Sequence, residues 1–411
     1  MDFDIMLFMN IIITTLFGLE SPTRDDLTAI NYSRDQITVT DGVVTLSVPD
    51  DNWQLDVARV NMWVRSGERV FIELGSFDLE ETKNPQIAYN EFFEKTAKID
   101  WNEYIPKDYA FIVNGYSRNS IIYGVPTLQK LSKKAIVDSL KASRGLQGMV
   151  YEDENIGTVR IQFGVVKNHV KLMADTTGDG LHKRGYRPLT HEAPIRETLA
   201  SGMIRLTHYS PFGAEALYDP FCGSGTIVIE ACMQALNIAP GKNRNFAFES
   251  LPYIGRTPFR KALMEARELE DLSAMDDCYF FGSDIDSQAV ASAKRNAQAA
   301  GVADFIRFRV ADAATLPPES LKNITKMDRQ LVVTNPPYGG RLMTPEEADD
   351  IYRMIGRTYL KDGKCRKGIR LSVISPDDTF ERAIGHKADK RVKLYNGNIK
   401  CQLNNFYKLA K

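Results

Sequence analysis

The chain has 411 residues, more than one hydrophobic core usually serves, so two or three domains are expected. With 43% hydrophobic and 26% charged residues, the composition is that of a folded globular protein and argues against long disordered stretches. The formal net charge of -1 excludes binding to nucleic acid through an overall positive potential, so any such contact must come from a local basic patch.

The chain begins with a hydrophobic run over residues 5–19. Asp2 and Asp4 stand where a signal peptide needs positive charge, and the run is too short to cross a bilayer. We therefore predict a buried β-strand that runs into a turn at Gly18, and no membrane segment. The cysteines form no CxxC spacing with histidines near by, which favours free thiols in a reducing cytoplasm and no metal site.

The first half of the chain reads as small α+β units. A helix is expected over residues 21–30, and strands over 37–39 and 43–48. Further along, residues 128–140 have the period of an amphipathic helix, and 159–165 with 169–174 read as paired strands. The stretch that follows, from Asp175 to Ala193, is rich in Gly, Thr, Pro and basic residues and is a linker or a functional loop.

The second half shows a repeated strand-then-helix rhythm. Strands are expected at residues 216–219, 279–284, 306–310, 330–334 and 370–375, with helices at 226–236, 287–300 and 346–360. Apolar strands separated by helices predict a mostly parallel α/β sheet with helices on both faces. The dipeptide Asn396-Gly397 lies between two further strands and predicts a terminal antiparallel β-hairpin. This combination is the shape of a Rossmann-like class I methyltransferase.

A glycine-rich loop, residues 219–226 (DPFCGSGT), follows the first of these strands and opens a helix. Its glycines allow a tight turn close to a ligand, and the helix N-terminus offers free amides. The third glycine of a dinucleotide fingerprint and the lysine of a P-loop are both missing. A purely structural turn is the remaining alternative to the loop of an enzyme that binds S-adenosylmethionine (SAM). On the SAM interpretation, the loop residues that hold the cofactor are Asp219, Phe221, Gly223, Gly225 and Thr226.

Acidic residues follow the next two strands. Asp284 can accept both ribose hydroxyls of a nucleoside in a bidentate contact, with Asp286 as a weaker candidate. Alternatively, Asp286 caps the following helix. Asp312 can accept from an adenine amino group, although the same residue is equally readable as a turn acid.

The sharpest motif is Asn335-Pro336-Pro337-Tyr338, directly after an apolar strand. An exocyclic amino nitrogen is a poor nucleophile, because its lone pair is delocalised into the ring. The Asn335 side-chain carbonyl and the Pro336 backbone carbonyl can accept its two N–H groups and aim the lone pair at a methyl group. Tyr338 offers a ring for stacking on a flipped base. A proline-fixed turn is the structural alternative, and we also expect Asn335 to contact the cofactor.

Two basic segments are candidates for contact with nucleic acid. Lys130, Lys133 and Lys134 lie on one face of the predicted helix 128–140, where a solvated surface is an equally good interpretation. The second segment combines charge with an aromatic ring beside the predicted catalytic domain. Its candidate contacts are Lys183, Arg184, Tyr186 and Arg187.

With these motifs in place, the chain resembles the THUMP-domain N2-guanine RNA methyltransferases of the bacterial 23S ribosomal RNA type, over nearly its whole length. The resemblance is carried by residues 17–20, 125–126, 183–187, 193–199, 219–226, 335–339, 387–391 and 395–397, together with Arg341. It implies a ferredoxin-like unit over residues 1–50, a THUMP RNA-binding domain over 51–172, a linker over 173–192 and a SAM-dependent catalytic domain over 193–411.

The activity that the resemblance implies is methylation of a guanine N2 amino group in 23S ribosomal RNA, with Arg341 among the RNA contacts. Gly340 stands where many relatives carry an acid, which bears on the choice of target. A tRNA guanine methyltransferase, an adenine or glutamine amino-methyltransferase, and a non-catalytic RNA-binding assembly factor are the alternatives.

Overall fold

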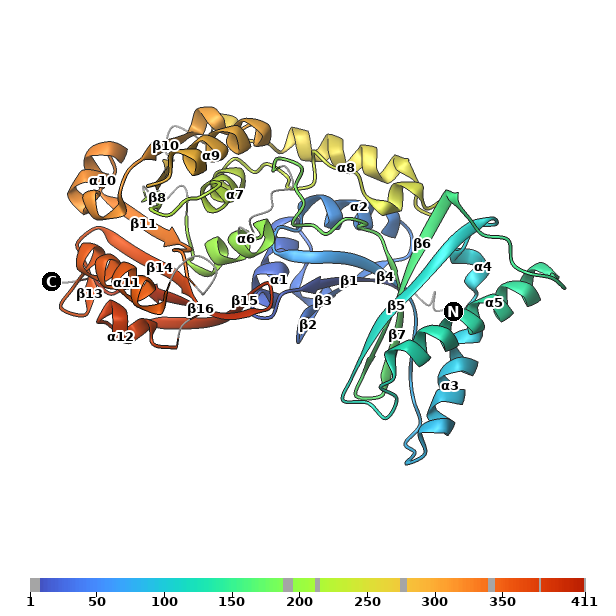
Figure 1. Ribbon diagram of the computed structural model, residues 1–411. Helices are drawn as coiled ribbons and strands as arrows, with labels where there is room; N and C mark the ends of the chain where they lie inside the picture. The colour runs from blue at the N-terminus through green and yellow to red at the C-terminus, as the bar shows by residue number, and fades with distance from the viewer. Residues whose placement is uncertain are drawn as a thin grey trace.

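A computed structural model describes residues 8–187, 195–210, 215–273, 279–338, 344–376 and 378–409. The molecule is elongated: one large sheet runs from its middle to one end, and the other lies at the opposite end (Figure 1). Each of the two large sheets has seven strands, and a two-stranded ribbon, β12 (Leu360–Lys361) with β13 (Lys364–Cys365), accompanies the second.

The first sheet joins the two N-terminal units. Its strands, in spatial order, are β2 (Ile37–Thr40), β3 (Val43–Pro49), β1 (Phe8–Thr15), β4 (Gly67–Asp78), β7 (His169–Asp175), β6 (Asp153–Val166) and β5 (Tyr109–Arg118). The apolar run at the start of the chain is therefore a strand, as predicted. β1 pairs with β3 on one side and β4 on the other, so the sheet continues across residue 50.

The helices of the first half are α1 (Glu20–Ala29), α2 (Trp53–Trp63), α3 (Pro85–Ala97), α4 (Trp101–Tyr104) and α5 (Val125–Arg144). α5 is the predicted lysine helix, and it begins earlier because Pro126 suits its first turn. It ends at Gly145, which has a left-handed φ of 63°. Its apolar face is buried, and its lysines point to solvent.

The second sheet is mostly parallel and confirms the predicted fold class. Its strands, in spatial order, are β10 (Ile306–Val310), β9 (Phe280–Asp284), β8 (Glu215–Asp219), β11 (Arg329–Thr334), β14 (Ile369–Ser375), β16 (Ile399–Phe406) and β15 (Lys390–Asn396). The first five run parallel, and β16 is antiparallel to both of its neighbours. β15 and β16 form the predicted terminal hairpin.

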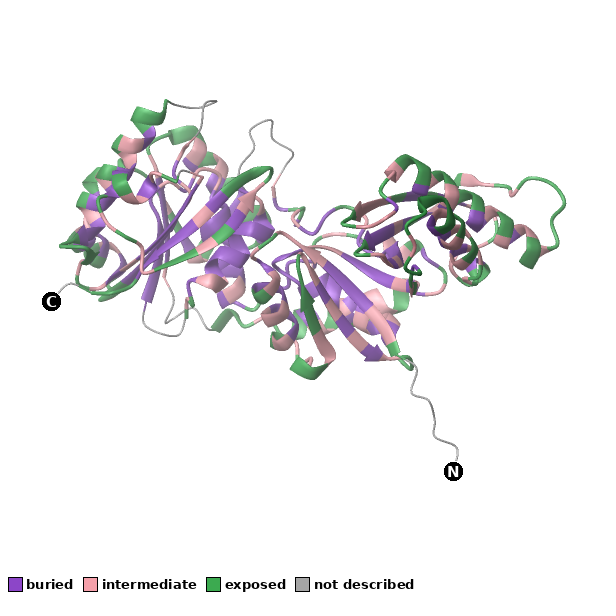
Figure 2. Ribbon diagram, turned by 90° about the horizontal axis from the view of Figure 1, so that it is seen from below, coloured by how far each residue is buried: buried purple, intermediate pink, exposed green. Residues whose placement is uncertain are grey.

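Helices cover both faces of this sheet, and successive residues of a strand pack alternately into the two hydrophobic cores on these faces. Leu331 and Val333 join one buried cluster with α6 (Glu197–Leu206), α7 (Thr226–Ala235) and α9 (Ser287–Ala300). Val332 joins the other, with α10 (Pro318–Thr325), α11 (Pro345–Tyr359) and α12 (Phe380–Ile384). Figure 2 shows the buried strands of both sheets between more exposed helices. This arrangement leaves the carboxyl ends of the parallel strands free to form a site.

Two connections pack the halves together. α8 (Arg256–Glu268) lies alongside α2 of the first half (Figure 1), and its Ala262 and Ala266 belong to the N-terminal core. Arg59 holds Glu265 across this contact, with two bonds of 2.7 Å. Residues 173–175 of the predicted linker belong to β7, so the prediction starts the linker too early. Residues 176–187 have no helix or strand, yet Thr177 is buried and donates to Asn61 at 2.7 Å.

Candidate active site

The candidate site lies where the strands β8, β9 and β11 end. These strands are adjacent and parallel in the order β9-β8-β11, so the loops after them meet at one edge of the sheet. In open α/β sheets, the crevice outside the carboxyl ends of the strands is where ligands bind. The glycine-rich loop, Asp284 and Asn335 all stand at this edge, which is what the sequence predicted of them.

The glycine-rich loop is shaped by two glycines that do different work. Gly225 has φ +83°, and a Cβ there would lie 3.0 Å from Ala293 and from Phe308, so this glycine lets α7 pack against its neighbours. Gly223 has φ +49°, and nothing lies within 4 Å of where its Cβ would be. The loop therefore leaves open space at Gly223, which suits close approach of a ligand to the backbone.

The first turn of α7 completes the loop. Thr226 is buried, and its hydroxyl accepts a bond of 3.1 Å from Arg187. Arg187 also pairs with Glu197 at 3.0 Å. Phe221 packs against the core on the far face of the sheet, and its N–H donates to Asp219 at 3.1 Å. Free amides at a helix N-terminus stabilise a carboxylate, so this turn fits the charged end of an amino-acid-bearing cofactor.

Asp284 ties the two neighbouring loops together. Its carboxylate accepts from the N–H of Gly223 at 2.9 Å and from the N–H of Asp286 at 3.0 Å. The half-buried carboxylate is thus fixed beside the open space at Gly223 and keeps lone pairs for hydroxyl donors. Asp286 and Asp312 are exposed, and each caps a helical turn. The Asp286 carboxylate accepts from the Gln288 N–H, and the Asp312 carboxylate accepts from the Ala314 N–H. A cofactor contact for these two residues stays a prediction.

Asp219 is fully buried behind the loop. Burial raises the pKa of its carboxyl to about 7, against hydrogen bonds from Thr334 and Phe221 that lower it. The Thr334 hydroxyl donates to Asp219 at 2.7 Å. Because Thr334 is the residue before Asn335, this bond joins the glycine-rich loop to the NPPY motif. The contacts make Asp219 an internal brace for the loop, and direct contact with the cofactor stays a prediction.

Asn335 carries an unused acceptor. Its side-chain oxygen Oδ1 is buried and has no hydrogen-bond partner among the described residues. Leaving a buried amide oxygen unpaired costs on the order of 1–3 kcal/mol, so such an atom in a native site needs a reason. Pro336, which follows, is buried and fixes the chain direction there. A donor brought by a ligand would satisfy Oδ1.

Tyr338 is held by the terminal hairpin. Its hydroxyl accepts from Asn396 Nδ2 at 2.8 Å, and the half-buried ring packs against the core that contains α6 and α7. Burial raises the pKa of this phenol, so it is neutral at physiological pH. The NPPY segment is thus anchored to β15, a contact that the sequence does not reveal. Stacking of Tyr338 on a base stays a prediction.

The structure corrects two of the predicted RNA contacts. Arg184 is buried beside Glu230, and Tyr186 is buried with its hydroxyl 3.0 Å from the same carboxylate. Arg187 is half-buried and bonds to Thr226 and Glu197, and an RNA contact for it stays a prediction. A buried charge or phenol needs a hydrogen-bonding partner, and the protein supplies one to each of these side chains. The contacts therefore stabilise the packing of the loop on α7. Lys183 alone of the four is exposed, and it pairs with Asp179 at 2.9 Å.

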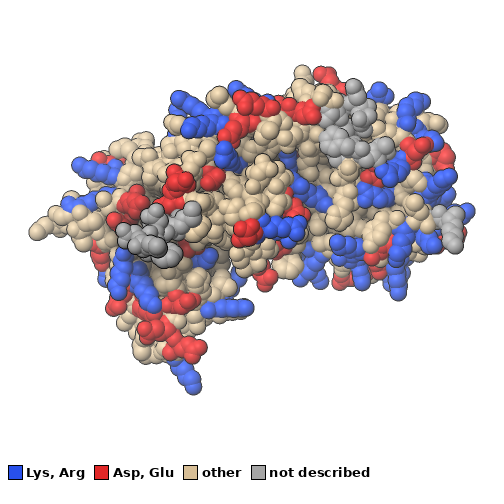
Figure 3. Space-filling view, turned by 180° about the vertical axis from the view of Figure 1, so that it is seen from behind, with Lys and Arg blue, Asp and Glu red and all other residues tan. Residues whose placement is uncertain are grey.

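The α5 lysines remain available at the surface. Lys130, Lys133 and Lys134 are all exposed. Lys133 lies 5.2 Å from the ring of Phe111 and 3.7 Å from a Glu152 oxygen, and Lys134 lies 5.3 Å from the ring of Phe93. Figure 3 shows Lys and Arg interspersed with Asp and Glu over one face of the molecule, as the near-zero net charge predicts. Arg341 lies outside the described residues.

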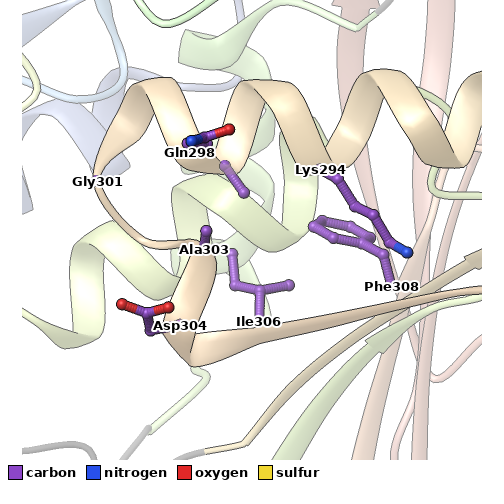
Figure 4. A pocket seen from close by; sticks show the side chains of 8 residues that line it. Lys294, Gln298, Gly301, Ala303, Asp304, Ile306 and Phe308 are labelled. Carbon is purple, nitrogen blue, oxygen red and sulfur yellow. The ribbon is translucent and has the colours of Figure 1, made fainter.

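A separate hollow lies away from this edge, between the end of α9 and the start of β10. Figure 4 shows Lys294 and Gln298 of α9 above Asp304 and Ile306. Ile306 is the first residue of β10, whereas the site described above lies beyond the last residues of the parallel strands. The hollow is therefore at the opposite edge of the sheet and is not part of the candidate site.

Among the described residues, none of the helices combines the length and apolar character needed to cross a membrane. Nor do three or more His, Cys, Asp or Glu side chains of the described ranges gather in a way that could hold a metal ion.

The sheet is parallel and ends in an antiparallel hairpin, and the glycine-rich loop, Asp284 and Asn335 stand at the carboxyl ends of its strands. This fold and site define a methyltransferase that uses SAM. SMU.472, a putative methyltransferase solved in complex with SAH, is 30% identical, has a TM-score of 0.82 and aligns over 98% of this chain and 99% of its own. The open space at Gly223 and the unpaired Asn335 oxygen fit such a ligand.

The chain belongs to the RMKL-like methyltransferase domain family, whose model matches residues 184–405. A model of the RlmL ferredoxin-like domain matches residues 10–71. Among curated relatives, the putative RNA methyltransferase YpsC of Bacillus subtilis is 32% identical over 97% of this chain and 95% of its own length. The ribosomal RNA large subunit methyltransferase K/L of Psychromonas ingrahamii is 33% identical over 85% of this chain, which spans 44% of that relative.

Proposed function

We propose that the protein transfers a methyl group from SAM to the exocyclic N2 amino group of a guanine in 23S ribosomal RNA. The observation that carries the proposal is the buried, unpaired Oδ1 of Asn335 at the ligand edge of the sheet. The names of the K/L relatives and of YpsC support an RNA substrate. The choice of guanine N2 rests on the resemblance described above.

Two acceptors orient the amine in this proposal. Oδ1 of Asn335 and the backbone carbonyl of Pro336 accept the two N–H groups, which directs the nitrogen lone pair out of the ring plane. SAM, when bound, would supply the methyl group on a positively charged sulfur that leaves as a neutral thioether, and the methylated amine would release one proton to water. Alignment therefore supplies most of the rate, and no strong base is required among the protein side chains. Gly223, Gly225, Thr226 and Asp284 hold the cofactor, with smaller contributions from Asp286 and Asp312.

The first half of the chain grips the RNA in this proposal. We propose a THUMP domain over residues 51–172, with Lys130, Lys133 and Lys134 on exposed positions of α5 as phosphate contacts. Lys183 and Arg341 are proposed to contact RNA nearer the catalytic domain. The cytoplasm is the proposed location, since ribosomal RNA is modified there.

Nucleoside mass spectrometry of ribosomal and transfer RNA from a deletion strain tests the substrate. We expect N2-methylguanine to fall at one position of 23S ribosomal RNA and to return with the wild-type gene. Loss of the modification from tRNA instead would identify a tRNA guanine methyltransferase. Loss of N6-methyladenine would move the reaction to the adenine amino group.

The purified Asn335→Ala protein tests the mechanism. It should bind SAM with nearly wild-type affinity in calorimetry, yet methylate RNA slower by orders of magnitude. Asn323→Ala, a change of the same type at an exposed position of α10, should leave both measurements unchanged. Near-normal turnover by Asn335→Ala would remove the proposed role of the amide. A wild-type protein that binds no SAM would instead support a non-catalytic assembly factor.

A further inference from the structure

Phe17, Lys393 and Tyr395 form a surface group, here called the aromatic–lysine cluster, that the catalytic proposal does not use; Phe17 and Lys393 are exposed and Tyr395 is half-buried. The two rings meet edge to face, with centroids 6.1 Å apart. The Lys393 ammonium lies 5.0 Å from the centroid of Phe17 and 5.6 Å from that of Tyr395. Phe17 is 44% exposed, so its ring is open to a partner.

The exposure of Phe17 is built into the fold. The next residue but one, Leu19, is fully buried in the core of the C-terminal half. Glu20 accepts from the N–H of Gly18 at 2.8 Å and from the N–H of Gly42 at 3.0 Å. Gly18 itself has φ +90°, and a Cβ there would lie 2.2 Å from the Lys393 carbonyl oxygen. The turn is therefore clamped on β15, and the clamp holds the Phe17 ring at the surface.

The cluster stands at the same edge of the sheet as the NPPY motif. Thr334 pairs with Val373 of β14, and Ser375, two residues further on, pairs with Gln402, which pairs with Lys393. Lys393 and Tyr395 thus lie level with the residues just beyond Thr334. β11 and β15 are three strand spacings apart, about 14 Å. The bond from Asn396 to the Tyr338 hydroxyl links the two places directly.

The charges around the cluster favour a polyanion. No carboxylate of the described residues lies within ion-pair distance of Lys393, and Lys400, which pairs with Tyr395, is exposed. Arg391, two residues before Lys393 and on the same face of the strand, adds a positive charge and lies 3.7 Å from Glu381, while the nearby Glu20 carboxylate is engaged by the Gly18 and Gly42 amides. Aromatic rings with adjacent cations are what proteins use to stack unpaired bases while holding the neighbouring phosphate. Two rings are too small an apolar area for a stable protein interface.

We propose that the aromatic–lysine cluster stacks an unpaired nucleotide of the RNA that flanks the base being methylated. The inference rests on the proposed function, because it takes RNA as the substrate. A nucleotide base packs on the Phe17 and Tyr395 rings, and Lys393 swings from the rings to a phosphate. The cluster thereby holds the strand on one side of the flipped base, and it fixes which nucleotide reaches Asn335.

Fluorescence anisotropy with a labelled 12-nucleotide oligoadenylate and the full-length protein tests this. The Phe17→Leu, Tyr395→Leu double variant should bind on the order of tenfold more weakly or worse, because each ring contributes stacking. Its salt dependence should be unchanged. Lys393→Gln should lower the slope of log affinity against log salt by about 0.7, the signature of one lost phosphate contact on a single strand. Replacing one adenine by 2-aminopurine should show quenching with wild type that the double variant loses.

Two matched variants separate stacking from folding. Tyr395→Phe keeps the ring and should bind like wild type. Tyr407→Leu removes a tyrosine that is 47% exposed at the other end of the hairpin and should also change nothing. The inference would be overturned if the double variant kept the wild-type melting temperature and bound RNA as tightly as wild type. It would also be overturned if the double variant bound RNA normally but changed its oligomeric state. The nucleoside map of the deletion strain is independent of these results, so failure of the proposed function would be seen separately.

Discussion

The hydroxyl of Thr334, the last residue of β11, donates to the buried carboxylate of Asp219, the last residue of β8, at 2.7 Å. This bond sets the glycine-rich loop and the NPPY motif at a fixed separation. Replacing Thr334 by Val keeps the shape but leaves Asp219 with the Phe221 N–H as its remaining hydrogen-bond donor among the described residues. We expect a loss of about 1–3 kcal/mol in the free energy of unfolding in urea. Thr334→Ser keeps the hydroxyl and should lose much less; equal losses in the two variants would show that the bond is unimportant.

The pKa of Asp219 makes a prediction about pH. Its value of about 7 in the folded chain is above the ordinary 3.8, so the folded state holds this proton more tightly than the unfolded state. The contribution of Asp219 to stability is therefore fully present below about pH 4 and falls as the pH rises to about 7. Asp219→Asn removes this dependence. Relative to wild type, the Asn variant should gain on the order of a few kcal/mol in unfolding free energy between pH 5 and pH 8.

The comparison cancels other titrating groups, such as Glu197, whose pKa burial also raises to about 7. Urea unfolding at several pH values gives the difference directly. A stability difference between Asp219→Asn and wild type that stays constant from pH 5 to pH 8 would contradict the assigned pKa.

The two loop glycines should respond differently to the same substitution. Gly225→Ala places a methyl 3.0 Å from Ala293 and Phe308 and should lower the unfolding free energy by about 1–3 kcal/mol. Gly223→Ala meets no neighbour and should cost only the strain of its positive φ, about 1–2 kcal/mol, whereas Gly225, also at positive φ, bears the clash in addition. SAM affinity measured by calorimetry should nevertheless drop at least tenfold in Gly223→Ala, because the methyl fills space that the ligand needs. Unchanged affinity would place the cofactor elsewhere.

Glu230 should be one of the most sensitive charged positions in the chain. Its carboxylate is fully buried and accepts hydrogen bonds from the Ser201 hydroxyl at 2.5 Å and the Tyr186 hydroxyl at 3.0 Å. The Arg184 guanidinium lies 3.5 Å from the same carboxylate. Glu230→Ala leaves the Arg184 guanidinium buried without its carboxylate and should cost about 3–5 kcal/mol in unfolding free energy. Asp328→Ala breaks the exposed ion pair with Lys322 and should leave the unfolding free energy essentially unchanged, because solvent screens this pair. Similar losses in both variants would argue against a buried anchor at Glu230.

The parts of the site that the sequence could predict are local ones. A glycine loop, an acid or an Asn-Pro-Pro run directly after an apolar strand is visible in a few residues, and parallel strands bring such loops to one edge. What escaped prediction depends on partners far along the chain. Tyr186 and Glu230 are separated by 44 residues, so the burial of the predicted RNA loop could not be read from its basic, aromatic composition. The packing of α8 on α2 was hidden for the same reason.

Leu19 lies in the core of the C-terminal half, and Ala262 and Ala266 of α8 lie in the core of the N-terminal half. The hydrophobic core of each half thus includes residues from the other half. A chain divided within residues 173–192 would leave both fragments with uncovered apolar surface, so we expect them to be soluble when produced together and to aggregate when produced apart.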